Sequence, residues 1–385
     1  MKRWISLLLI LLILLPMSAL AIDQAETDKQ VDLIFRRAKA IGGSLVVIKD
    51  GQVLYTRDYG LRNINKHLPV DENTYFKMGC VTKMVASLGI LQLIEDGTLE
   101  LDRDISDYFG YDIANPYFPK TPITLRQLLS HTSTVSEKGG YSNLRSTVEQ
   151  MLSAKLRRKN NFTKFEPGSK YAYSNFGSGL VGSIVEAVTG QTINDFVVQR
   201  VFAPLQIDAS MEGSQLLHPD NLASVYKDGK LSRAAQRYTN SEIDHTPNPE
   251  THYRDLVGGL MIRSRDLARL TIALCGDGSV DGVRYLQPET VQLMRKVQMD
   301  LGKSVTGFSP YGLFLERNTR VLPGKIIYGH QGMTGGASNN VFFDPETQFI
   351  MVITSNGNSQ VRDHGTIVMA QNMLRYTYPL FAGEE

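Results

Sequence analysis

Residues that favour β-strands gather near the two ends of this chain, and helical patterns fill the middle. Near the start, the runs 44–48 and 52–56 are separated by Lys49-Asp50-Gly51, which predicts a β-hairpin. Further β-rich runs lie at 326–328, 340–343 and 349–354. If the strands from both ends form one sheet, the middle of the chain is an insertion between two parts of that sheet. We therefore predict an α/β (α+β) fold in which an antiparallel sheet is flanked by helices and carries an inserted, mostly helical lobe.

Helical periodicity sets the expected lobes. We predict a first helix over 24–39 and a closing helix over about 366–376. The inner helices are expected at 82–95, 125–130, 143–154, 179–189, 193–201, 265–274 and 288–297. The α/β lobe then comprises about 22–80 and 300–385, and the helical lobe about 81–299. A crevice between two such lobes is a natural place for chemistry.

The N-terminus has the three parts of a secretory signal peptide. Basic residues at 2–3 precede an apolar run over 4–17, and residues 19–21 are Ala-Leu-Ala. We expect cleavage after Ala21 and export to a periplasmic, cell-envelope or extracellular location. The apolar run is shorter than the about 20 residues of a membrane span, although retention as an anchor stays open. We expect no membrane span in the mature chain, residues 22–385.

Charge and cysteine content restrict the partners. The 385 residues include 41 Lys and Arg against 39 Asp and Glu, so neither nucleic acid nor a strongly anionic surface is implied. We expect a small-molecule or peptide substrate, with no metal and no cofactor. Cys80 and Cys275, the two cysteines, lie in unrelated patterns. We expect two free thiols, with pairing left open.

Cys80 stands three residues before Lys83 at the start of a predicted helix. Residues i and i+3 share a helix face, so the Lys83 side chain can reach the Cys80 sulfur. A sulfur in the first turn also lies near unpaired backbone N–H groups and the positive end of the helix dipole. Both influences favour the thiolate. Taken alone, however, a free cysteine is more often a small buried hydrophobe.

Three further segments carry polar residues that could complete a site with Cys80. In 165–175, a Pro-Gly turn is followed by Tyr-Ser-Asn at 173–175. The segment 329–336 reads Gly-His-Gln-Gly-Met-Thr-Gly-Gly beside a strand, and 130–133 reads Ser-His-Thr-Ser at the end of a short helix. Each short motif alone is weak evidence. Their shared order and spacing are a much stronger signal.

In the order Cys-x-x-Lys, His-Thr-Ser, Tyr-x-Asn and His-x-Gly, these motifs resemble those of the serine β-lactamase and penicillin-binding-protein superfamily. The branch is the one that holds class C β-lactamases, D-alanyl-D-alanine carboxypeptidases, D-aminopeptidases and related esterases. The resemblance covers nearly all of the mature chain and includes the family-like segments 95–102 and 258–269. It implies a β-lactamase/transpeptidase-like fold and a hydrolase of this family.

The resemblance also implies roles for individual residues. The catalytic groups fall on Cys80 in place of the family's serine, on Lys83 as general base, on Tyr173, and on His330 across the cleft, and the substrate-binding groups fall on Asn175, Gly332 and Met333. The backbone N–H groups of Cys80 and Met333 would form the oxyanion hole. Gly332 would let the backbone approach a ligand closely. His131 supports a loop in the family, and we interpret Glu166 as a loop residue.

Three of these residues have plainer alternatives. His330 could be an ordinary histidine at the end of a strand, and Tyr173 could be a core aromatic residue with a satisfied hydroxyl. Asn175 could cap the helix that is expected to start near Phe176, and both roles can hold together.

Cysteine at the nucleophile position leaves two hypotheses of different kinds. The first is an exported acyl hydrolase or acyltransferase that acts on an amide, peptide or ester, by default a peptidoglycan-derived one, through a thioester on Cys80. Tyr173 would then chiefly protonate the leaving group. Sulfur is larger than oxygen, so we expect poor β-lactam turnover. The second is a catalytically inactive protein of the same fold that binds a cell-wall or peptide ligand.

Overall fold

The computed structural model describes residues 22–383 except 142, 144, 241, 243 and 299–310. The predicted signal peptide, residues 1–21, lies outside the described residues. Within the described part, no helix combines the length and the apolar character needed to cross a membrane.

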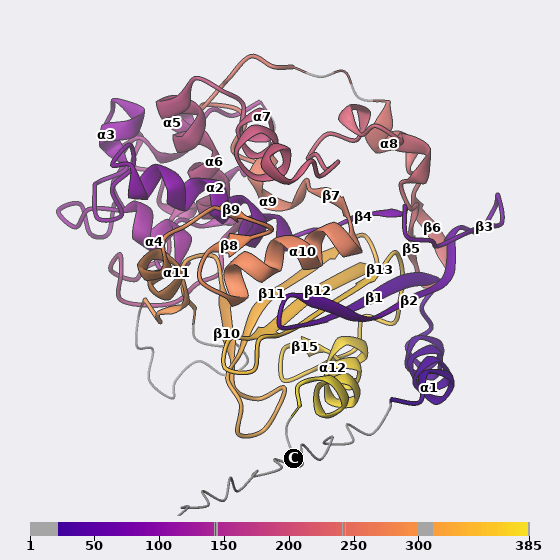
Figure 1. The fold of residues 1–385 in the computed structure, drawn as a ribbon. Helices are drawn as coiled ribbons and strands as arrows, with labels where there is room; N and C mark the ends of the chain where they lie inside the picture. Colours follow the sequence, from indigo (N-terminus) through magenta and orange to yellow (C-terminus); the bar gives the residue numbers. More distant parts are fainter. Residues whose placement is uncertain are drawn as a thin grey trace, which may run out of the picture.

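A seven-stranded antiparallel sheet forms the centre of the molecule (Figure 1). Its order is β10-β11-β12-β13-β1-β2-β3. The strands are β1 (Gly42–Lys49), β2 (Gln52–Asn63), β3 (Leu68–Pro69), β10 (Glu316–Asn318), β11 (Ile327–Thr334), β12 (Ala337–Asp344) and β13 (Phe349–Ser355). Strand β1 pairs with β13, with Val46 opposite Val352, so the two ends of the chain meet in mid-sheet. The prediction of an antiparallel sheet built from both termini is confirmed.

The first hairpin follows from its turn. Asp50 and Gly51 both have positive φ, 51° and 75°, which is the backbone of a type I′ turn and matches the twist of the flanking strands. Glycine takes this conformation without steric cost, and aspartate tolerates it. The predicted hairpin is confirmed, with Lys49 belonging to β1.

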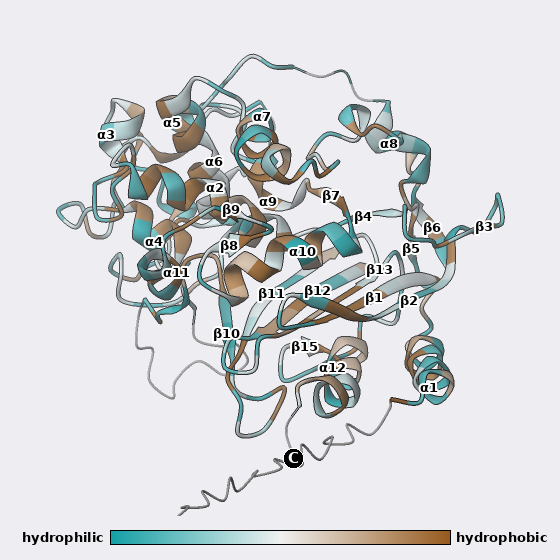
Figure 2. Ribbon diagram, viewed as in Figure 1, coloured by the Kyte–Doolittle hydropathy of each residue, from teal (hydrophilic) through white to brown (hydrophobic). Residues whose placement is uncertain are grey.

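Helices cover both faces of the sheet, so its central strands are apolar on both sides. In β1, Leu45 and Val47 join the core beneath α1 (Gln24–Arg37) and α12 (Val368–Phe381). Val46 and Ile48 join the core on the opposite face, below α10 (Ser264–Cys275). This alternation follows from the two-residue period of a strand. Figure 2 shows hydrophobic colour along both the central strands and the covering helices.

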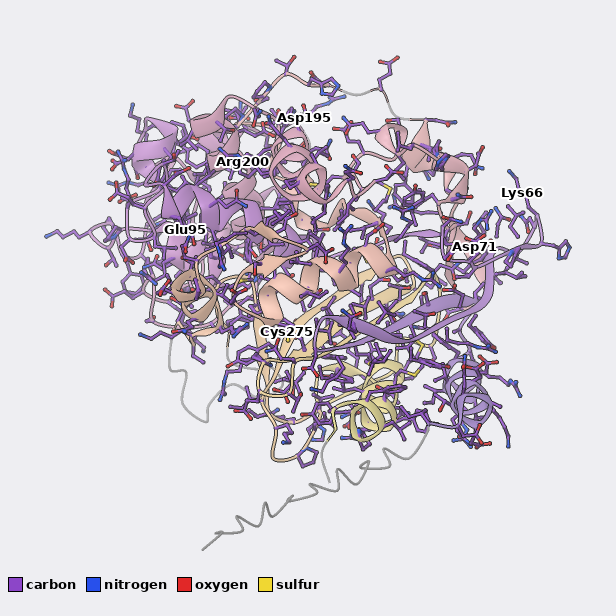
Figure 3. The ribbon with its side chains drawn as sticks, viewed as in Figure 1. Lys66, Asp71, Glu95, Asp195, Arg200 and Cys275 are labelled. Atoms are coloured by element: carbon purple, nitrogen blue, oxygen red, sulfur yellow. The ribbon has the colours of Figure 1, made fainter. Side chains whose placement is uncertain are left out.

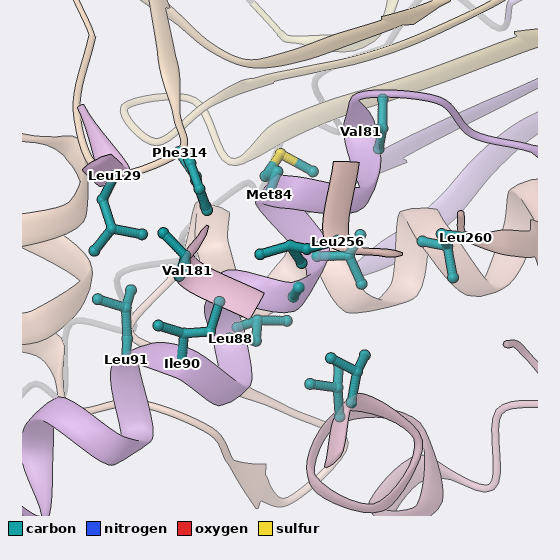
Figure 4. Packing of buried hydrophobic residues seen from close by; sticks show 14 of the residues in the cluster. Val81, Met84, Leu88, Ile90, Leu91, Leu129, Val181, Leu256, Leu260 and Phe314 are labelled. Carbon is teal, nitrogen blue, oxygen red and sulfur yellow. The ribbon is translucent and has the colours of Figure 1, made fainter. Parts of the chain in front are cut away.

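Helix α2 (Val81–Glu95) runs through the inserted part and is buried on nearly every side. A helix that is apolar all round belongs in a core. Its side chains pack against those of neighbouring segments, among them Val181, Leu256 and Phe314 (Figure 4). Cys80 directly precedes this helix, so the surrounding core holds the start of α2 in one place.

The remaining elements belong to the inserted part or to its connections. The helices are α3 (Ser106–Phe109), α4 (Leu125–Leu129), α5 (Val148–Leu152), α6 (Asn175–Thr189), α7 (Ile193–Val197), α8 (Gln236–Thr239), α9 (Asp255–Gly258) and α11 (Pro288–Arg295). The short strand pairs are β4 (Tyr75–Lys77) with β7 (Met261–Arg263), β5 (Val225–Lys227) with β6 (Lys230–Arg233), β8 (Ser279–Val280) with β9 (Val283–Arg284), and β14 (Arg362–Asp363) with β15 (Thr366–Ile367). The lobe boundaries at about 80 and 300 stay a prediction.

Several elements differ from their expected bounds, among them β2 and α12, which end seven and five residues later than expected. Three other differences have a clear physical cause. The helix expected over 143–154 is confined to α5, because Thr147 forms a capping box with Gln150 and starts the helix there. The helix expected over 193–201 changes after α7 into a π-helical turn, Val198–Phe202. Strand β11 continues to Thr334 and so contains the His-x-Gly motif, residues 330–332, because pairing with β12 outweighs the low strand preference of its glycines.

Replacing Gly332 with alanine should destabilise the fold strongly. A Cβ atom there would lie 2.0 Å from the Met78 carbonyl oxygen, so β11 and the start of α2 would have to separate. We expect a loss of about 3 kcal/mol in the free energy of unfolding, measured by denaturant titration. The matched control is Gly97→Ala, where φ is +78° and the surroundings are open, with an expected cost of about 1 kcal/mol. Equal losses in the two variants would contradict this account.

Candidate active site

Cys80 lies at the edge of a cavity of about 200 Å³, at the N-terminal end of α2. Tyr173, His330 and Met333 line the same cavity. The structure therefore brings together four of the residues predicted from the motifs, although Cys80 and His330 are 250 positions apart in the chain. Cys80 is partly exposed, and its thiol is free.

Lys83 is fully buried behind Cys80. Its Nζ donates to Asn175 Oδ1 over 3.1 Å and to the Val257 carbonyl oxygen over 2.7 Å. Burial lowers the pKa of Lys83, and the nearby Cys80 and Glu137 oppose that change. A neutral amine has two N–H donors and one lone pair. In the unprotonated form, towards which burial shifts Lys83, the two oxygens can take both donors and leave the lone pair for the proton of Cys80.

Tyr173 has a largely buried hydroxyl with no hydrogen-bond partner among the described residues. Burial is the main cause that raises the pKa of Tyr173 well above 10, and the charge of Cys80 is the second. The phenol therefore keeps its proton and lies near the sulfur. The side-chain interaction of the hydroxyl with Cys80, at a cavity and with no other partner among the described residues, favours the functional interpretation over the core-aromatic one.

Asn175 is the first residue of α6, and it does not cap the helix. Ser174 caps it instead, because the Ser174 hydroxyl accepts from the Gly177 N–H over 2.9 Å. The alternative interpretation of Asn175 as a cap is thus wrong. Its side chain is free to hold Lys83, while its backbone N–H donates to the Glu137 carboxylate.

His330 is buried and held from both ring nitrogens. Its Nδ1 lies 2.7 Å from the Gln331 carbonyl oxygen, and its Nε2 lies 2.6 Å from the Tyr311 hydroxyl. A carbonyl can only accept, so Nδ1 carries the proton and Tyr311 donates to Nε2. Burial, followed by the charge of Lys83, lowers the pKa of His330 to about 3. The imidazole is therefore neutral and does not supply a positive charge to the cavity.

Gly332 was expected to let the backbone approach a ligand, and in the structure it lets β11 approach another part of the backbone. A side chain there would strike Met78 O at 2.0 Å and come within 3.1 Å of Cys80 N. The glycine thus lets β11 pass against the start of α2. Met333 N and O lie correspondingly close to Gly79, whose φ is +56°. This packing puts the backbone of Met333 beside that of Cys80, as two donors to one oxygen require.

The motifs did not point to Tyr311 and Glu316, which also line the cavity. In the sequence, the glycine that follows Tyr311 could have drawn attention to this segment. The structure shows why a glycine stands there, because a Cβ atom at Gly312 would lie 2.0 Å from Met294 O. The remaining lining residues include Tyr171, Asn318, Gln331, Arg362, His364 and Thr366.

The supporting roles expected of His131 and Glu166 stay predictions. The His131 ring packs 4.2 Å from the Tyr173 ring, centroid to centroid, and its Nδ1 accepts from the Ser174 N–H. Glu166 accepts from the Thr121 hydroxyl at an exposed site and does not line the cavity.

A cluster of possible metal ligands lies outside the cavity. Donor atoms of Glu186, His252 and Asp255 come within 4.8 Å of one another. The Glu186 carboxylate, however, already accepts from the backbone N–H groups of Ile193 and Asn248. This carboxylate therefore joins α6 to neighbouring loops within the described structure.

Cys275 contrasts with Cys80. It ends α10 in the interior between helix and sheet (Figure 3), where its Sγ lies 3.5 Å from the Asp344 carbonyl oxygen. Both cysteines are free thiols, as expected. Burial raises the pKa of Cys275 to about 12, so that thiol is unreactive.

Comparison with known proteins identifies the family. A family model described as beta-lactamase matches residues 26–371, and the chain therefore belongs to the beta-lactamase family. Esterase EstB of Burkholderia gladioli is 28% identical over 255 residues, which are 61% of this chain and 62% of EstB. Protein flp of Staphylococcus aureus (strain N315) is 26% identical over 193 residues, which are 48% of this chain and 37% of that protein. The chain thus spans less than two thirds of the length of these curated relatives.

Solved structures share the fold over most of the chain. The octameric penicillin-binding protein homologue from Pyrococcus abyssi has a TM-score of 0.69 at 22% identity, covering 92% of this chain and 78% of its own. The D-amino acid amidase from Ochrobactrum anthropi SV3, complexed with D-phenylalanine, has a TM-score of 0.68 at 20% identity, covering 93% and 100%. EstCE1, a hydrolase with promiscuous acyltransferase activity, has a TM-score of 0.68 at 20% identity, covering 90% and 97%. The β-lactamase/transpeptidase-like fold is confirmed.

The neutral His330 should make stability depend on pH. Its pKa is about 6.5 when unfolded and about 3 when folded. As pH falls below 6.5, the unfolded chain therefore binds a proton that the folded chain excludes. This difference should remove about 2 kcal/mol of stability between pH 7 and pH 5. His330→Gln should lose that part of the pH dependence, measured by denaturant unfolding at both pH values.

The control for this measurement is Val341→Ala, which truncates the buried residue opposite His330 on β12. It should lower stability equally at both pH values. An unchanged pH dependence in His330→Gln would show that the histidine is not held neutral.

Proposed function

We propose that this member of the beta-lactamase family is an acyl hydrolase or acyltransferase that acts on an amide, peptide or ester through a thioester on Cys80. The observation that carries the proposal is the arrangement of Lys83. Two oxygens hold its amine beside Cys80, and burial favours its unprotonated form. Perturbed titratable groups that converge on a cavity are typical of active sites.

The first half of the proposed reaction moves one proton and forms one bond. Lys83 Nζ accepts the thiol proton of Cys80 as the sulfur attacks the substrate carbonyl carbon. The negative charge that develops on the carbonyl oxygen is stabilised by the N–H groups of Cys80 and Met333.

The second half restores the enzyme. As the tetrahedral intermediate collapses, Tyr173 protonates the leaving amine or alcohol and regains a proton from Lys83. Water or an amine then attacks the thioester, losing a proton to the site as the Cys80 thiol is regenerated. Water gives hydrolysis and an amine gives acyl transfer. His330 acts as a neutral partner that fixes the Tyr311 hydroxyl.

Several facts support the substrate class. The names of related proteins include an esterase, an amidase and a hydrolase with acyltransferase activity, and all three chemistries attack an acyl carbonyl. The signal-like N-terminus favours an exported enzyme, for which a peptidoglycan-derived peptide is an accessible substrate. The larger sulfur atom should place a β-lactam carbonyl poorly, so we propose slow β-lactam turnover.

Removing the thiol tests the central claim. With p-nitrophenyl acetate, the mature protein should gain one acetyl group, located on Cys80 by mass spectrometry of its peptides. Cys80→Ala should lose the adduct and the turnover. The control, Cys275→Ala, should keep both, since that thiol is buried. An unmodified Cys80 in protein that is stable and still turns over the ester would overturn the proposal.

Tyr173→Phe should separate substrates by their leaving groups. An amide must expel a strongly basic amine, so loss of the phenol should lower kcat/KM about 100-fold or more. p-Nitrophenolate leaves without a proton, so the ester of the same acyl group should be affected less than about fivefold. The measurement is kcat/KM for both substrates with both proteins. An equal loss of kcat/KM for the amide and the ester would show that Tyr173 positions other groups and does not protonate the leaving group.

A further inference from the structure

The charge of this chain is nearly balanced overall, but it is unevenly distributed. Between positions 155 and 170, six basic residues accompany one acid, Glu166. The six are Lys155, Arg157, Arg158, Lys159, Lys164 and Lys170. All of them are exposed, and none forms an ion pair with another residue that the structure describes. Unpaired like charges on one segment produce a local positive potential.

Hydrogen bonds hold this segment against the chain at 112–122. The buried Asn115 side chain donates to the carbonyl oxygens of Thr163 and Phe165 over 3.0 and 3.3 Å. At the other end of the segment, the Ala154 N–H donates to the Asp112 carbonyl oxygen over 2.8 Å. The basic side chains therefore project from a backbone that is fixed at several points.

Contacts between these two stretches of chain bring the basic groups together. Lys159 Nζ lies 5.4 Å and Lys164 Nζ 5.8 Å from the centroid of the Tyr117 ring, so both approach one aromatic ring. A cavity of about 470 Å³ beside them is lined by Lys120, Arg157 and Lys159, among other residues. Lys120 is also exposed. Together with the six basic residues of 155–170 it forms what we call the basic surface.

Few acidic groups adjoin the basic surface. Glu166 accepts from the Thr121 hydroxyl over 3.0 Å, and Asp104 and Asp112 line the same cavity as Lys120. Seven basic side chains are thus accompanied by three carboxylates. The surface keeps a net positive charge and attracts anions.

Two apolar side chains are exposed within the basic surface. Leu156, between Lys155 and Arg157, is 50% exposed, and Phe165 is 38% exposed. Lys170 Nζ lies 4.2 Å from the centroid of the Phe165 ring. A dissolved polyanion would contact the charges and leave the apolar groups in water. An anionic bilayer accommodates both, because basic groups contact lipid phosphates while apolar groups enter the boundary with the acyl chains.

We propose that the basic surface binds the headgroup face of a bilayer that contains anionic phospholipids. The surface ends one residue before Tyr171, which lines the cavity that contains Cys80. Binding would therefore hold that cavity close to the membrane. The inference does not depend on the proposed function, because binding to a bilayer needs no catalysis.

Co-sedimentation with lipid vesicles measures this binding. The protein used is residues 22–385, because the apolar run at 4–17 would itself partition into lipid. At about 100 mM salt, we expect vesicles of phosphatidylcholine with about 30% phosphatidylglycerol to bind the protein about 10-fold or more tightly than pure phosphatidylcholine vesicles. Raising the salt to about 500 mM should remove that preference, because salt screens exposed charges.

Two variants test the two components of the surface. Arg157→Gln, Arg158→Gln and Lys159→Gln combined should weaken binding to the anionic vesicles about 30-fold or more, because each basic group near the bilayer adds to the attraction. Leu156→Ser should weaken it about fivefold without changing its dependence on salt, because the leucine contributes apolar burial. All four side chains are exposed, so the variants should fold, which circular dichroism checks.

The control makes the same chemical change elsewhere. Arg36→Gln, Arg37→Gln and Lys39→Gln combined also remove two arginines and one lysine from exposed positions. These positions lie at the end of α1, far from α5 and the segment that follows it (Figure 1). The control should weaken binding less than about threefold.

Equal binding to the two kinds of vesicle, or an equal loss in the control, would overturn the inference. The same holds if polyphosphate binds the protein as tightly as the anionic vesicles do and Leu156→Ser has no effect. The partner would then be a dissolved polyanion and not a bilayer.

Discussion

The contact between the backbone of β11 and the first turn of α2 is the constraint on which the site depends. Gly332 passes so close to Met78 and Cys80 that no side chain fits between them, and Gly79 has a positive φ where it meets Met333. Close-packed backbones transmit position accurately because neither can shift independently. This contact joins the sheet to the inserted part and places the thiol of Cys80 beside the His-x-Gly motif of β11.

Burial gives the site its electrostatic character. It lowers the pKa values of Lys83, His131 and His330, and it raises those of Tyr173 and Tyr311. Each of these groups is thereby driven toward its neutral form. A neutral amine next to a thiol can accept a proton, and a neutral phenol can donate one. Burial also raises the pKa of Glu316, while its hydrogen bonds with Gln331 and the charge of Arg362 oppose that change.

The two cysteines show how position decides reactivity. Cys80 follows a glycine turn and is reached through a cavity, whereas Cys275 is enclosed between α10 and the sheet. The same element that exposes Cys80 also brings Lys83 beneath it, since the two residues are one helical turn apart. A reactive thiol and an inert one therefore coexist in one chain.

Patterns within the sequence determined whatever depends on neighbours along the chain. The hairpin at Asp50-Gly51, the helix after Cys80 and the order of the motifs can all be predicted, because turn chemistry and helical periodicity act over a few residues. The prediction that four distant residues share one site came from the resemblance to the β-lactamase superfamily and not from local patterns. These residues are Cys80, Lys83, Tyr173 and His330.

Tertiary structure alone decided the rest. Ser174, and not Asn175, caps α6, and pairing with β12 extends β11 through the His-x-Gly motif. Tyr311 and Glu316 reached the cavity only because β10 pairs with β11, more than 230 positions after Cys80 in the chain. Strand register and burial depend on contacts between segments that are distant in the sequence. A pattern over a few residues cannot predict which groups those contacts will shield from solvent.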